Sequence, residues 1–192
     1  MEQIPGTNTI IFTSPINDES ATKLINKLLT LESEIKDRTK TLKRKFDDFE
    51  KSKDDKDKDK GYKNKEINMI VSTDPIILRI KSNGGHVHSA FTIIDAIKEM
   101  SIPVHTVCTG LVASAGTLIS LAGTKRFMTK HAYMLIHEIR SGSWGTYSNM
   151  QDNFENSTNL MNRIKNYYII NTKITEEDIT DILKKDLYWD AD

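Results

Sequence analysis

Three side chains far apart in this 192-residue sequence could together perform nucleophilic catalysis. Ser114 lies in the small-residue stretch GLVASAGTLISLAG, directly after an apolar run typical of a β-strand. A serine hydroxyl becomes a useful nucleophile only when a nearby base removes its proton. His137 ends the apolar run AYMLIH, and Asp186 follows the last predicted helix, so an imidazole and an orienting carboxylate are both available. These three residues are the candidate catalytic set.

Each of these residues also has a structural explanation. A serine in a small-residue helix start more often serves close packing, and a histidine at the end of a strand need not be catalytic. Asp186 alone could be a surface acid or a helix cap. Asp181, Asp190 and Asp192 compete with it for the third position because they lie in the same segment. The combination and order of the residues, rather than any one of them, favours catalysis.

A glycine turn could supply the other half of such a site. Asn83-Gly84-Gly85 follows a predicted buried strand, and glycines let a backbone turn sharply and bring exposed N–H groups close to a ligand. If Ser114 begins a helix, the N–H group of Ala115 points to the same space, together with the positive end of the helix dipole. Backbone donors beside a hydroxyl group predict an oxyanion site.

Alternating strands and helices are expected to position these residues. This order is typical of a single α/β domain, here residues 1–192, with a mainly parallel sheet and right-handed crossovers. In such sheets reactive groups gather at the carboxyl ends of the strands. The predicted strands cover 9–16, 76–80, 102–110 and two short pieces of 125–138, and the predicted helices cover 17–35, 88–100, 113–123, 148–172 and 175–185.

A Lys- and Asp-rich segment interrupts this pattern over residues 36–66. Such a composition buries too little apolar surface to offset the entropy of ordering it, so a solvated, flexible insertion is predicted. A partner-binding arm is the alternative, and its mixed charges argue against a phosphate-binding patch. The first part could instead extend the preceding helix, because Leu42, Phe46 and Phe49 recur at helical spacing.

The composition gives no support to nucleic-acid or membrane partners. The chain has 27 basic and 27 acidic side chains, and no apolar run approaches the roughly 20 residues that span a bilayer. The N-terminus lacks the basic start and apolar core of a signal peptide. The single cysteine, Cys108, rules out an internal disulfide and is predicted to be a buried, inert thiol. We therefore expect a soluble, cytoplasmic protein.

No metal or organic cofactor is predicted. His86 and His88 form a His-x-His pair, but no third ligand is evident in the sequence, so solvated loop histidines are favoured over a metal site. Hydrolysis through a serine, a histidine and an aspartate needs no cofactor.

From Ile76 to the C-terminus the sequence resembles the ClpP family of self-compartmentalising serine proteases. The resemblance is carried by RIKSNGG, VHTVCTGLVASAG, MLIHE and LKKDLYWDA. The segment IIFTSPINDESATKLINKLLTLESE is also similar to the first strand and helix of that family. The implied fold is the ClpP/crotonase-like α/β fold, built from repeated β-β-α units with a long handle helix, here 148–171.

The resemblance also implies roles for the candidate residues. Ser114 would be the nucleophile, His137 the general base and Asp186 the acid that orients it. The N–H groups of Gly85 and Ala115 would form the oxyanion hole. The implied protein is an ATP-independent serine endopeptidase core that assembles into heptameric rings, commonly stacked in pairs as a tetradecamer. An AAA+ unfoldase would feed it unfolded protein or peptide.

The sequence departs from the family pattern in several places. Asn83 replaces a proline, which predicts a less rigid oxyanion strand, and Glu138-Ile139 replaces Gln-Pro after the histidine. The closing strand of the family is missing after Asp186, which predicts a truncated C-terminus.

Three rival functions stay open: a crotonase-type acyl-CoA enzyme, a noncatalytic ring subunit, and a phage capsid-maturation protease of the same fold, which would act in the host cytoplasm.

Overall fold

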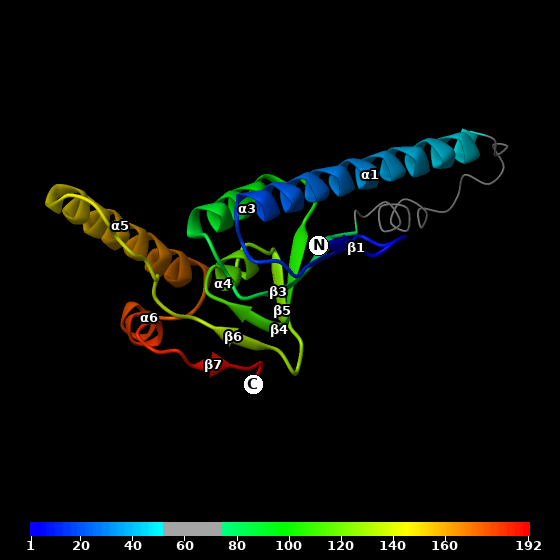
Figure 1. Cartoon of the computed structure of the whole chain (residues 1–192). Helices are drawn as coiled ribbons and strands as arrows, with labels where there is room; N and C mark the ends of the chain where they lie inside the picture. The colour runs from blue at the N-terminus through cyan, green and yellow to red at the C-terminus, as the bar shows by residue number, and fades with distance from the viewer. Residues whose placement is uncertain (52–73) are drawn as a thin grey trace.

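A computed structural model describes residues 1–51 and 74–192 as a sheet covered by helices (Figure 1). The helices are α1 (Asp18–Lys51), α3 (Val87–Glu99), α4 (Ala115–Ser120), α5 (Tyr147–Asn171) and α6 (Glu176–Leu183). The strands are β1 (Glu2–Gln3), β2 (Thr9–Phe12), β3 (Ile76–Ser82), β4 (Val104–Ala113), β5 (Lys125–Met128), β6 (Tyr133–Leu135) and β7 (Tyr188–Trp189).

The sheet is parallel at its centre and antiparallel at both edges. Its order is β1-β2-β3-β4-β6-β7, and β5 pairs with β4 beside β6. The pairs from β2 to β6 are parallel, whereas β1 and β7 are antiparallel edge strands of two residues each. The predicted α/β class is confirmed. Neither edge strand was predicted, because a two-residue strand is too short to produce an alternating pattern.

The register of the sheet brings three strand ends together. Ser82, the last residue of β3, lies opposite Val112 of β4. Ala113, the last residue of β4, lies opposite Leu135, the last residue of β6. Because the three strands are parallel, the segments that follow them leave from the same edge of the sheet. These segments begin at residues 83, 114 and 136, so they carry the glycine turn, Ser114 and His137.

The core lies between the sheet and the helices α1, α3 and α4. Helices α1 and α3 run side by side across the sheet, with α4 beside α3 (Figure 1). The buried face of α1 repeats at helical spacing, as the sequence predicted, although Leu29 is half exposed. Large side chains that are fully buried include Ile10, Phe12, Leu24, Leu28, Leu31, Leu78, Ile80, Ile93 and Ile119.

Helix α1 continues far beyond the sheet (Figure 1). Residues 36–51 form its second half, which is the helical extension that the spacing of Leu42, Phe46 and Phe49 favoured. This half is mostly exposed, so the helix there is supported by few tertiary contacts; one is the hydrogen bond from Arg38 to Asn8 at 2.6 Å. The rest of the predicted insertion, 52–66, lies outside the described residues.

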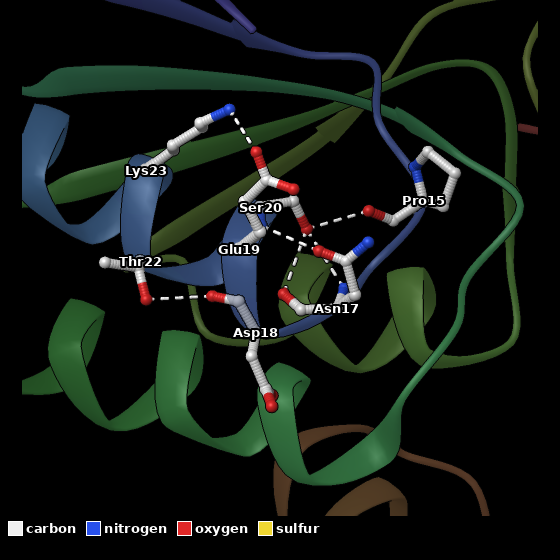
Figure 2. A network of polar contacts seen from close by, with 7 residues as sticks. All are labelled: Pro15, Asn17, Asp18, Glu19, Ser20, Thr22 and Lys23. Atoms are coloured by element: carbon white, nitrogen blue, oxygen red, sulfur yellow. Dashed lines mark hydrogen bonds and ion pairs between the residues drawn. The ribbon is translucent and has the colours of Figure 1, made fainter.

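The start of α1 is fixed by a reciprocal capping box (Figure 2). The Asn17 side chain accepts a hydrogen bond from the Ser20 N–H at 2.8 Å, and Ser20 Oγ accepts one from the Asn17 N–H at 3.0 Å. Ser20 Oγ also donates to the Pro15 carbonyl at 2.8 Å. The N-cap residue is therefore Asn17, and the carboxylate of the next residue, Asp18, accepts a hydrogen bond from Ser89 at 2.6 Å. This network holds the backbone that leads into α1.

Helix α5 projects from the other side of the molecule (Figure 1). It spans Tyr147–Asn171, close to the predicted handle, and begins with a second capping box in which Thr146 pairs with Asn149. Only its C-terminal part is buried, at Ile164 and Tyr168. No helix within the described ranges is long and apolar enough to cross a membrane.

Candidate active site

The Gly84-Gly85 turn is clamped against the segment that precedes α1. The Ile16 N–H donates to the Gly84 carbonyl, and the Ile16 carbonyl accepts from the His86 N–H, both at 2.8 Å. These bonds engage the Gly84 carbonyl and the His86 N–H, so the Gly85 N–H between them is left available to a ligand. Ser82 Oγ also stabilises the turn, because it donates a hydrogen bond to the Ser14 carbonyl and accepts one from the Gly84 N–H.

Gly85→Ala is expected to destabilise this turn. An added Cβ would lie 2.1 Å from the Ile16 carbonyl oxygen, and φ is +146°, which side chains disfavour. We expect the backbone to shift, at a cost of about 1–3 kcal/mol in unfolding free energy. Thermal unfolding would measure the loss. Gly142→Ala, with nothing within 4 Å of its added Cβ, is the matched control; equal midpoints for the two variants would contradict the close packing.

Ser114 has an unusual backbone conformation. Its φ of 53° and ψ of −126° make it the only non-glycine residue with positive φ within 1–51 and 74–192. It is the N-cap residue of α4, but its side chain does not cap the helix. Ala115 is the first residue of α4, so its N–H group is one of those that intrahelical bonds leave free. A strained serine between a strand and a helix, with a free donor beside it, resembles an activated nucleophile.

His137 is held by Asp186, which lies 49 residues later in the sequence. Its Nδ1 atom lies 2.9 Å from Asp186 Oδ1. A carboxylate only accepts hydrogen bonds, so Nδ1 carries the proton and Nε2 stays basic. The His137 side chain is 14% exposed, whereas Asp186 is 57% exposed and its other oxygen accepts from Arg140 Nη2 at 2.7 Å. Arg140 and His137 together fix both oxygens of the carboxylate.

One cavity of about 270 Å³ joins these parts. Among the described residues no hydrogen bond joins Ser114 Oγ to His137, although both residues line the same cavity. In active sites without substrate, catalytic hydrogen bonds are often long or poorly aligned, and they tighten in the complex with substrate. The cavity is lined by Asn83, Gly85, Val87, Ser114, Ala115, Leu118, His137, Ile139, Arg140, Ile164 and Tyr168.

The structure separates Asp186 from its competitors. Asp181 forms a surface ion pair with Lys184 at 3.8 Å, and the Asp190 side chain accepts a hydrogen bond from the Asp192 N–H. Neither they nor Asp192 contact the histidine. His137 itself lies two residues beyond β6, not at the end of the strand as predicted, because β6 stops at Leu135.

Glu138, His86 and His88 do not line this cavity. Glu138 is exposed and lines a separate groove along α5, so its carboxylate is not directed into the cavity. His86 and His88 are both exposed. The part of the chain that the structure describes contains no group of three His, Cys, Asp or Glu residues placed to hold a metal ion.

Three residues at this site were not identified from the sequence. Arg140 binds the Asp186 carboxylate, and Thr117 and Tyr168 contact each other behind Ser114. An arginine three residues after the candidate base is a weak signal that could have been used. Tyr168 gives no such signal, because a tyrosine in an amphipathic helix reads as an ordinary core residue.

Comparisons with known proteins show the family of this chain. The sequence profile of the Clp protease family matches residues 66–192. The ATP-dependent Clp protease proteolytic subunit 1 of Chlamydia caviae is 34% identical over 122 residues, which cover 62% of this chain and 64% of that protein. The protein of the same name from Chlamydia abortus matches equally well. That of Chlamydia trachomatis serovar D is 27% identical over 186 residues, 95% of this chain and 78% of the relative.

The match covers the whole candidate site. The first two relatives are matched over less than two thirds of their own length. The range matched by the family profile nevertheless contains Gly85, Ser114, His137 and Asp186. The ClpP-like fold predicted from the sequence is confirmed. This chain belongs to the Clp protease family.

Proposed function

We propose that this protein is a serine endopeptidase that hydrolyses peptide bonds through an acyl-enzyme. Ser114 is the nucleophile, His137 is the general base, and Asp186 holds the imidazole in the required tautomer. The observation that carries the proposal is the shared cavity: the strained serine and the histidine line it together, and the imidazole is bonded to a carboxylate at 2.9 Å.

The chemistry follows from these positions. Ser114 Oγ attacks the carbonyl carbon of the scissile bond while His137 Nε2 takes the hydroxyl proton. The developing oxyanion accepts hydrogen bonds from the N–H groups of Gly85 and Ala115, which no other part of the site uses. His137 then gives its proton to the leaving amine, and the same base activates the water that hydrolyses the ester. Neither a metal ion nor an organic cofactor takes part.

The proposal extends to assembly and partners. A single chain exposes large apolar side chains, among them Trp144 at 99%, Phe154 at 77% and Ile170 at 80%. Exposed apolar surface of this kind supports contact with other copies, and heptameric rings, stacked in pairs through α5, are the assembly we propose. Unfolded polypeptide delivered by an AAA+ unfoldase is the proposed substrate. The buried, unpaired Cys108 agrees with a cytoplasmic site of action.

Asp186→Asn is expected to lower kcat by about 10³- to 10⁴-fold. The amide can donate to Nδ1, which would favour the tautomer that carries its proton on Nε2 and cannot act as the base. Asp181→Asn is the matched control, because that carboxylate pairs only with Lys184 on the surface. A kcat for Asp186→Asn within threefold of that of Asp181→Asn would contradict the orienting role.

The test of the proposed function is hydrolysis of small fluorogenic peptides by the purified chain, with its mass measured in the same buffer by light scattering. We expect cleavage that does not require ATP and that is greatest in the assembled fraction. Fully assembled rings that cleave no peptide would contradict the proposal and support a noncatalytic subunit.

A further inference from the structure

The backbone of Ser114 needs support on both sides. A non-glycine residue at φ 53° is strained and persists only where neighbouring groups hold it. On one side, the Ser114 N–H donates to the Leu135 carbonyl of β6 at 2.8 Å. On the other side, the Ser114 carbonyl accepts two hydrogen bonds from Thr117, from its N–H at 2.9 Å and from its Oγ1 at 2.6 Å.

The Thr117 hydroxyl is in turn bound by a residue of α5. Thr117 Oγ1 and the Tyr168 hydroxyl lie 2.5 Å apart, and both side chains are buried. Thr117 has one hydroxyl proton, which it gives to the Ser114 carbonyl, so the tyrosine must be the donor of the second bond. The result is a directed chain of hydrogen bonds from Tyr168 through Thr117 to the residue that carries the nucleophile.

Burial keeps this chain in its donating form. The Tyr168 side chain is 3% exposed, and the loss of solvation raises the pKa of its phenol far above the ordinary value. The phenol therefore keeps its proton at neutral pH and well above it. Tyr168 also lines the active-site cavity, one helical turn after Ile164, so α5 contacts both the cavity and the strained turn.

We infer that Tyr168 is a positioning residue for Ser114, acting through the Thr117 hydroxyl to hold the nucleophile in its strained, reactive conformation. The inference rests on the proposed function, because it assigns a role in acylation of Ser114. Tyr168 touches no reacting atom. Its effect is on how often the serine hydroxyl occupies the geometry from which it attacks.

Tyr168→Phe tests the inference with little change in packing. We expect the rate at which a fluorophosphonate probe phosphonylates Ser114, with release of fluoride, to fall about five- to tenfold, the effect of one lost buried hydrogen bond. Tyr167→Phe is the matched control. Tyr167 is the preceding residue of the same helix, and its buried hydroxyl has no hydrogen-bond partner among the described residues. Its removal should leave the rate unchanged.

Variants of Thr117 separate positioning from stability. Thr117→Val keeps the shape and removes the hydroxyl that bonds both Ser114 and Tyr168, so it should be at least as slow as Tyr168→Phe, and the double variant should be no slower than Thr117→Val alone. Thr117→Ser, which keeps the hydroxyl, should recover most of the rate that Thr117→Val loses. The thermal midpoints and assembly masses of the same variants, measured in parallel, should not rank them in the order of their reaction rates.

The outcomes are distinguishable. A wild-type chain that never reacts with the probe overturns the proposed function and the positioning role with it. A reactive wild-type chain whose Tyr168→Phe variant reacts at the rate of Tyr167→Phe overturns the positioning role alone. Losses that are additive in the double variant, or that track thermal midpoints across the series, also overturn it, because they indicate general destabilisation.

Discussion

Ser114→Ala is expected to lower kcat for a fluorogenic peptide by about 10⁴- to 10⁶-fold. The variant removes the atom that we propose forms the acyl-enzyme, whereas the proposed oxyanion donors and the cavity remain. The residual activity should therefore be that of a site which binds the peptide and stabilises charge but has no nucleophile. Because alanine adds no atoms, KM and the assembly mass should change little.

The control for this variant is Ser141→Ala, in the exposed loop after the histidine. It should keep the wild-type kcat. If Ser114→Ala retained more than about one hundredth of wild-type activity in a preparation free of contaminating protease, another group would be the nucleophile and the proposed chemistry would fail.

His137→Ala is expected to cause a loss of similar size. Without the imidazole the proposed mechanism has no base to take the serine proton, and Asp186 loses its partner at 2.9 Å. Residues that act as a unit are not additive, so the Ser114→Ala/His137→Ala double variant should be no less active than either single variant. Steady-state kinetics on the three variants would measure this.

His131→Ala is the matched control for the histidine. His131 is exposed, lies before β6 and should tolerate the change with kcat unaltered. Independent losses that multiply in the double variant would contradict a shared step, because they would indicate that Ser114 and His137 contribute separately.

The edge of the sheet at which the candidate residues meet could be predicted from the sequence. Buried strands, each followed by glycines or small residues, predict a parallel sheet with loops at one edge. The structure lines one cavity there with Gly85, Ser114, Ala115 and His137. The roles of these residues stay predictions until they are tested.

The hydrogen bonds that Arg140 and Tyr168 make around the candidate site could not be predicted from the sequence. Arg140 reaches Asp186 across 46 residues of sequence, and Tyr168 reaches Thr117 across 51. No local spacing signals such pairs, because they depend on how α5 and α6 return to the sheet. The strained backbone of Ser114 was also not predicted. The sequence indicated only that a helix begins there, and the residue before a helix can adopt several backbone conformations.

The helix boundaries were hardest to judge at α1. The charged composition after residue 35 favoured loss of structure, yet the structure continues the helix to Lys51. Local helix propensity outweighed composition there, because Lys, Arg and Glu are good helix formers even where little is buried.

The central claim is that an imidazole makes the Ser114 hydroxyl reactive beside two backbone donors. The most direct test is to treat the assembled protein with a fluorophosphonate and locate the modified residue by mass spectrometry of its peptides. We predict one adduct per chain, on Ser114, with none on Ser114→Ala and a greatly slowed reaction in His137→Ala. An unmodified Ser114, or a label carried by a different residue in the wild-type chain, would contradict the claim.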